Sequence, residues 1–176
     1  MTRFTLPRYL TCQLMTCNLS DMSRLQEELK QNKPFPSTAH EGALGLMRTA
    51  DVLRRRGAAI VEPRGITLQQ YNVLRILRGA GEEGLPTLEV AARMVEQTPG
   101  ITRLMDRLEA KSLVRRQRCP KDRRQHLCWI TPAGRTLLDE LEQPMNEAVE
   151  AGFAKLDETD RIAFIRLLDA IRAALE

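Results

Sequence analysis

The segment from Thr98 to Thr131 constrains the fold most, because two different periodicities follow one another within it. In its first part, apolar residues recur at the spacing of one helix face: Ile101, Leu104, Met105 and Leu108. This spacing predicts a helix with one buried side. Thr98 suits the N-cap of that helix and Pro99 its first residue, where a missing N–H costs nothing.

A shorter helical pattern, TLEVAARMV at residues 87–95, comes just before this helix. Helical spacing predicts an inward face made by Leu88, Ala91, Ala92 and Val95. The exposed face of the second helix would carry Thr102, Arg103, Asp106 and Arg107. A short helix, a tight turn and a second helix with a basic face are typical of a helix-turn-helix unit.

The second part of the segment alternates apolar and polar residues at both ends and is basic in the middle. Val114–Cys119 and His126–Thr131 predict two short strands, which residues 120–125 join as a hairpin. Such a hairpin beside a helix-turn-helix is a wing, which can reach phosphates and the adjacent minor groove. We expect Asp122 to orient Arg124 at the tip, and Trp129 to anchor the wing to the body.

The charge of the chain is divided unevenly. Residues 98–126 hold nine Lys or Arg against three acids, whereas residues 133–176 hold five basic residues against ten acids. A local basic block of this kind favours a polyanionic partner. Aromatic residues make up only 4% of the chain, which disfavours the stacking platforms that bind single strands. Double-stranded DNA is the expected partner.

The patterns divide the chain into four parts. Residues 1–36 form an arm, expected to be flexible or loosely docked, and residues 37–64 a first dimerisation helix that opens with a capping box at Thr38 and Glu41. Residues 65–132 form the winged helix-turn-helix, whose first helix is capped by Thr67. Residues 133–176 form Leu- and Ile-rich dimerisation helices, the last capped near Asp157. The fold class is therefore mainly α with a small β-hairpin wing.

Several classes of protein are disfavoured. Charged residues interrupt every apolar run, and the N-terminus lacks a signal-peptide core, so we expect no membrane span and a cytoplasmic location. Four cysteines and two histidines lack metal-ligand spacing, and no nucleophile motif or Gly-rich phosphate loop is present. We expect no enzyme activity, cofactor or metal.

The string ITRLMDRLEAKSLVRRQRCPKDRRQHLCWITPAGRTLL resembles the MarR family of winged-helix transcription regulators. The similarity covers about residues 38–176, with a departure at Ser112, where relatives often have Gly at the helix end. The resemblance implies a homodimer on a pseudopalindromic operator, often a repressor that a small molecule releases. Matched residue by residue, Asp122 and Arg124 correspond to the Asp-x-Arg of the wing, and Pro99–Arg107 to the recognition helix.

The sequence offers candidate residues for two sites, one for DNA and one for an effector. The DNA-binding candidates are Thr98, Pro99, Gly100, Thr102, Arg103, Arg107, Arg116, Lys121, Asp122, Arg123 and Arg124. An effector, aromatic or carboxylate in character, is expected where the first, second and fifth helices meet, with His40, Arg48 and Tyr71 as candidates. Arg48 is the one best suited to hold a carboxylate.

Two alternatives stay open. The basic face could bind an acidic protein partner instead of DNA. A cysteine among Cys12, Cys17, Cys119 and Cys128 could make the chain a redox-sensing regulator, although simple packing is the expectation for the two wing cysteines.

Overall fold

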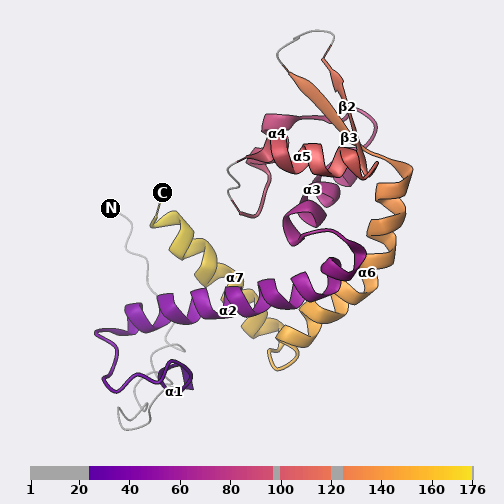
Figure 1. The fold of residues 1–176 in the computed structure, drawn as a ribbon. Helices are drawn as coiled ribbons and strands as arrows, with labels where there is room; N and C mark the ends of the chain where they lie inside the picture. The colour runs from indigo at the N-terminus through magenta and orange to yellow at the C-terminus, as the bar shows by residue number, and fades with distance from the viewer. Residues whose placement is uncertain (1–23, 97–99, 120–124, 176) are drawn as a thin grey trace. The chain divides into compact units, whose positions relative to one another are not determined.

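The structure is a computed structural model that describes residues 24–96, 100–119 and 125–175. The chain forms two compact units, Met1–Ala50 and Asp51–Glu176. Figure 1 shows the elements in chain order: α1 (Arg24–Glu28), α2 (Thr38–Val61), the 3₁₀ helix η1 (Glu62–Arg64), α3 (Leu68–Gly79), β1 (Leu85–Pro86), α4 (Thr87–Ala92), α5 (Ile101–Ala110), β2 (Val114–Arg118), β3 (His126–Ile130), α6 (Pro132–Phe153) and α7 (Glu158–Ala173). This order confirms the mainly α fold class with a small β-hairpin.

The start of α2 differs from the predicted capping box at Thr38 and Glu41. Ser37 is the capping residue, because its Oγ accepts from the backbone N–H of His40 at 3.3 Å. The Ser37 carbonyl accepts from the N–H of Glu41 at 3.1 Å. Thr38 is therefore the first residue of the helix, one position after the cap. His40 is the third helical residue, and its Nδ1 lies 3.1 Å from Ser37 Oγ.

Helix α3 begins as predicted at Thr67. The Thr67 hydroxyl accepts from Gln70 N–H at 3.2 Å, and the Gln70 side chain accepts from Thr67 N–H at 3.0 Å, which makes a capping box. Gln70 is itself almost completely buried, so this cap also satisfies polar groups inside the fold. The helix is therefore fixed at its first turn.

The apolar face predicted for residues 87–95 is wrong. Leu88 is 77% exposed and Val95 is 85% exposed, whereas Val90 is fully buried. The cause lies just before the helix, where β1 pairs with β3 and places Leu85 opposite Cys128. This pairing puts Leu85 in the core and sets the rotation of α4, which then ends at Ala92, before Val95.

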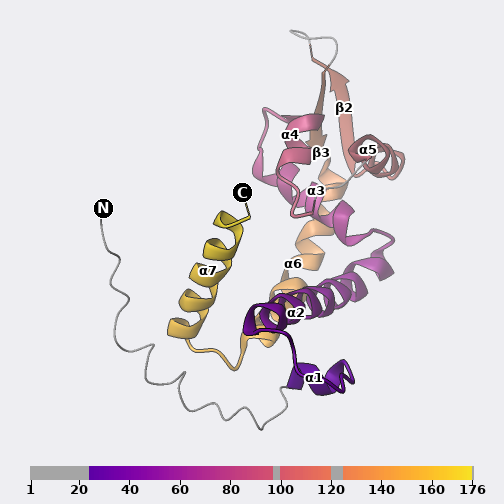
Figure 2. The same ribbon diagram turned by 90° about the vertical axis from the view of Figure 1, so that its left-hand side faces the viewer.

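The sheet has three antiparallel strands in the order β1-β3-β2. Strands β2 and β3 pair from Val114 opposite Ile130 to Arg118 opposite His126, so each is one residue shorter than predicted. Beyond the paired strands, the Cys119 N–H still donates to the Gln125 carbonyl at 2.9 Å. We call residues 114–130 the wing. The views in Figures 1 and 2 both show β2 and β3 side by side next to α5.

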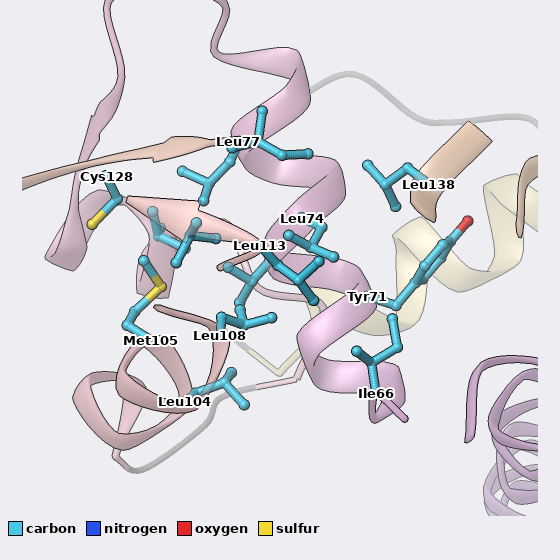
Figure 3. Packing of buried hydrophobic residues seen from close by; sticks show 14 of the residues in the cluster. Ile66, Tyr71, Leu74, Leu77, Leu104, Met105, Leu108, Leu113, Cys128 and Leu138 are labelled. Atoms are coloured by element: carbon cyan, nitrogen blue, oxygen red, sulfur yellow. The ribbon is translucent and has the colours of Figure 1, made fainter. Parts of the chain in front are cut away.

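The core lies between α3, α5, α6 and the sheet (Figure 3). Its fully or almost fully buried side chains include Val73, Leu74, Leu77, Val90, Met105, Leu108, Cys128, Leu138 and Leu141. Burying one Leu-sized side chain contributes about 1.5–3 kcal/mol before entropy is counted. This packing fixes one face of α5 and so decides which of its residues point outward.

Two further features complete the described part of the chain. Helix α6 is continuous across Pro144, and α7 is capped by Asp157, whose carboxylate accepts from Asp160 N–H at 2.8 Å. No helix in the described ranges combines the length and apolarity that a bilayer crossing requires. Nor do the described His, Cys, Asp and Glu side chains gather in threes that could hold a metal ion.

Candidate nucleic-acid interface

Helix α5 has the two faces that its sequence predicts. Leu104, Met105 and Leu108 are buried against the core, and Ile101 is half-buried. Thr102, Arg103, Asp106 and Arg107 are exposed on the opposite side. In the described parts of the chain, no carboxylate forms an ion pair with Arg103 or Arg107. Their charges can therefore meet a phosphate or a base edge.

The first residue of α5 differs from the prediction. The helix starts at Ile101, and its N-cap is Gly100, not Thr98. Gly100 has φ +93°, a left-handed conformation that side chains disfavour, so the chain turns sharply just before the helix. Thr98 and Pro99 lie outside the described residues. Because the N-cap is Gly100, no N-cap side chain accepts from the backbone N–H groups in the first turn of α5.

Ser112, just after α5, has φ +58°. A left-handed turn is therefore present here without the glycine that usually makes it. Its carbonyl accepts from the Thr131 hydroxyl at 2.8 Å, and its N–H donates to the Glu109 carbonyl at 2.8 Å. The turn from helix into wing is thus tied at both sides.

The base of the wing is anchored through Trp129, as predicted. The indole Nε1 donates to the Glu82 carbonyl at 2.9 Å, and the Arg115 guanidinium lies 4.0 Å from the ring centroid. Gly84, with φ +70°, lies so close that a Cβ there would be 2.5 Å from the indole. The turn before β1 therefore requires a residue without a side chain at this position.

Arg116 on β2 is bound to two carboxylates of α5. Its Nε donates to Glu109 Oε2 at 2.8 Å, and its Nη2 lies 2.5 Å from the same oxygen and 2.6 Å from Asp106 Oδ1. Hydrogen bonding to Glu109, and then to Asp106, raises the pKa of Arg116 despite its partial burial. We call Arg116, Asp106 and Glu109 the Arg116 cluster. This cluster distinguishes Arg116 from Arg103 and Arg107, which form no ion pair with any acid that the structure describes.

The tip of the wing carries the remaining predicted cations. Lys121, Asp122, Arg123 and Arg124 lie outside the described residues, and the pairing of Asp122 with Arg124 stays a prediction. Arg118, the last residue of β2, is exposed. It is paired with His126, the first residue of β3.

A shallow cavity of about 480 Å³ opens between α4, the start of α5 and the wing. Its lining includes Leu88, Ile101, Thr102, Arg116 and His126. Sequence reasoning missed Leu88 and His126 as members of this surface, because it assigned Leu88 to the core. The Thr87 hydroxyl, which donates to the His126 carbonyl at 3.3 Å, holds α4 against β3 here.

A second cavity, of about 400 Å³, lies in the unit Asp51–Glu176 between α2, α3, α6 and residues 94–96. Of the three effector candidates, Tyr71 lines this cavity, together with Arg54, Arg75, Asn72 and Met145. His40 and Arg48 are not among its lining residues. They belong to the unit Met1–Ala50, where Arg48 Nε is 3.9 Å from Glu28.

The two described cysteines are free thiols. Cys128 is fully buried in the sheet, and its Sγ lies 3.4 Å from the Thr87 hydroxyl. Burial raises the pKa of the Cys128 thiol, so it stays protonated at neutral pH and is a poor nucleophile. Cys119 is half-buried at the end of β2, and Cys12 and Cys17 lie outside the described residues.

Known proteins are similar to this chain in both sequence and fold. The MarR family model matches residues 66–126. A structure of a MarR transcription factor from Planctomyces limnophilus is 37% identical, with a TM-score of 0.60 over 78% of this chain and 99% of that one. The structure of Bordetella bronchiseptica BpsR, described in terms of the regulation of its DNA binding by 6-hydroxynicotinic acid, is 25% identical, with a TM-score of 0.68 over 80% of this chain and 98% of that one.

A third relative has a named role in transcription. The transcriptional activatory protein BadR of Rhodopseudomonas palustris is 31% identical over 100 residues, which are 56% of this chain and 57% of BadR. The relatives are thus named as transcription regulators, and the Planctomyces limnophilus protein is matched over almost its whole length. The chain belongs to the MarR family of winged-helix transcription regulators.

Proposed function

We propose that the chain is a homodimeric, sequence-specific regulator that binds double-stranded DNA and represses transcription until a small molecule releases it. The observation that carries this proposal is the outward face of α5. Arg103 and Arg107 stand there without ion-pair partners in the described chain, beside a wing whose strands are held to the same core. A helix of this width fits the major groove, and a basic hairpin beside it reaches the backbone and the minor groove.

The contacts divide by their position. Gly100, Thr102, Arg103 and Arg107 are proposed to meet the major groove, with Thr98 and Pro99 at the approach to the helix. Lys121, Asp122, Arg123 and Arg124 are proposed to meet the minor groove and its phosphates. Cations that contact phosphates release condensed counterions, so binding should weaken steeply with salt.

Support for a homodimer comes from α7. Ile162, Ile165, Leu167 and Ile171 are all exposed on this helix, and none of its residues is buried within the unit. Four large apolar side chains on one helix are more than a monomer leaves in water without cost. A second copy of the chain is the occupant we propose, because a two-fold dimer would present two copies of α5 to a pseudopalindromic site.

The cavity beside Tyr71 is proposed as the effector site. Its floor includes α3, and one wall is made by residues 94–96, which precede α5 by a few residues. A ligand there would contact residues 94–96, which belong to the connection between α4 and α5. BpsR, whose DNA binding 6-hydroxynicotinic acid regulates, has the same fold and gives a first compound to try.

The experiment is fluorescence anisotropy on duplexes that tile the DNA beside the gene, at two salt concentrations. We expect tight, salt-sensitive binding to one near-palindromic duplex. Arg103→Ala should lose about 1–3 kcal/mol there, the usual value of a good base contact. Lys155→Ala, which removes an exposed charge between α6 and α7, is the matched control and should bind as the wild type does.

Weak binding that is equal on every duplex, and that Arg103→Ala leaves unchanged, would contradict sequence-specific DNA binding. The basic face would then belong to an acidic protein partner.

A further inference from the structure

We propose that Arg116 is a positioning residue, whose ion pairs with Asp106 and Glu109 set the angle between α5 and the wing. This inference rests on the proposed function, because the angle matters only if both elements meet one duplex. It reverses the expectation that Arg116 contacts DNA itself.

Two of the three guanidinium nitrogens of Arg116 donate to acids of α5. Nε and Nη2 both donate to Glu109, and Nη2 also lies 2.6 Å from Asp106 Oδ1. The side chain is only 19% exposed, whereas Asp106 is 53% exposed. A planar guanidinium held by two carboxylates has few orientations left. Turning its Nε and Nη2 toward a phosphate would break the ion pairs with both acids.

The two acids lie three residues apart, so they project from adjacent turns on one side of α5. A cation that bridges both acids loses a contact when the helix rotates about its axis, and also when the helix moves away from it. On the other side, Arg116 is paired across the sheet with the buried Cys128, which keeps the start of its side chain fixed. The Arg116 cluster is therefore a stiff link between two elements that must meet one duplex.

Apolar packing joins the base of the wing to α5, because Val114 and Ile130 lie in the same core as Leu108. The other polar contacts lead elsewhere: Trp129 connects the wing to residues 82–84, and the Thr87 hydroxyl connects β3 to α4. Among described side chains, the ion pairs between the wing and α5 all come from Arg116. Without them the base of the wing stays packed on the core, and we expect its angle to α5 to vary more.

The decisive variant is Asp106→Asn combined with Glu109→Gln. It removes two negative charges from a DNA-facing helix, which by simple electrostatics would strengthen binding. If the acids serve to hold Arg116, affinity for the duplex found by anisotropy should instead fall by about tenfold, the usual range for coupled neighbours. Glu83→Gln, an exposed acid of the turn before β1, is the matched control and should bind as well as the wild type or slightly better.

A second measurement separates positioning from a general loss of stability. In the wild type, Arg124→Ala should strongly weaken binding to the duplex. In Asp106→Asn/Glu109→Gln or in Arg116→Met it should have little further effect, because a wing at the wrong angle would no longer bring Arg124 to the DNA. Arg116→Lys, which keeps the charge without the planar fork, should fall between the wild type and Arg116→Met. All affinities are compared at a temperature at which circular dichroism shows every variant folded.

The outcomes are distinguishable. If the wild type finds no preferred duplex, the proposed function fails and this inference with it. If the wild type binds but the paired acid variant binds equally or more tightly, or Arg124→Ala costs the same in every background, Arg116 is not a positioning residue and the regulator stands.

Discussion

Cys128 shows how burial decides the chemistry of a single residue. Its thiol is inside the sheet and its pKa is raised by that burial. In the unfolded chain the same thiol ionises at its ordinary pKa of about 8.5. Between the ordinary and the raised pKa the unfolded state loses a proton that the folded state keeps, so stability is fully present below this window and is lost as the pH rises through it.

We therefore predict two results for Cys128. Iodoacetamide at neutral pH should leave Cys128 unmodified in the native protein and modify it in urea, as mass spectrometry of the peptides would show. In denaturant titrations from pH 7 to 10, Cys128→Ala should lose less stability with rising pH than the wild type does. Rapid native alkylation of Cys128 would contradict the burial argument and revive a redox role for the wing.

Residue-level prediction from sequence succeeded where local chemistry is decisive. The anchoring by Trp129 was predicted, because a large aromatic residue on a short strand needs a core to pack against, whereas the sequence left the conformation of Ser112 open. Arg116 could not be assigned in the same way. Its partners Asp106 and Glu109 are known only once α5 and β2 are packed together, and a basic residue on a basic strand gives no sign of them.

Among the elements, length decided what the sequence could predict. Helix α5 shows four apolar residues at regular spacing, which fixes its buried face. Helix α4 has only six residues, less than two turns, so several faces fit its pattern equally well. The two-residue strand β1 left no periodic signal, yet its pairing with β3 determined which side of α4 is buried.

The connection between α4 and α5 carries a testable contact. The Asn72 side chain on α3 accepts from the Val95 N–H at 3.1 Å, and both residues line the proposed effector cavity. Asn72→Leu removes this acceptor and frees the segment that leads into α5. Affinity for the operator should fall by about 2- to 10-fold, the value of one hydrogen bond, because fewer molecules hold the binding conformation.

The control for that experiment is Asn146→Leu, which changes an exposed amide on α6. Both variants should fold normally by circular dichroism. Unchanged affinity in Asn72→Leu would mean that residues 94–96 do not connect the cavity to the recognition helix.

At the scale of the whole molecule, the distribution of charge and apolar surface was predictable, but the effector residues were less so. The basic segment and the Leu- and Ile-rich C-terminus are visible in composition alone. Tyr71 lines a cavity in the unit Asp51–Glu176, and its role in effector binding stays a prediction. His40 and Arg48 were chosen by chemistry only, and the cavity is instead lined by Arg54 and Arg75.

We expect two chains to bind one operator together. This expectation is tested most directly by sedimentation velocity of the protein with the duplex selected by anisotropy, for the wild type and for Ile165→Glu, which places a charge on the exposed apolar face of α7. We predict two wild-type chains per duplex, and a monomeric Ile165→Glu that binds weakly and one chain at a time. A wild-type monomer that occupies the duplex singly, with the same affinity as Ile165→Glu, would show that this chain does not bind its operator as a dimer.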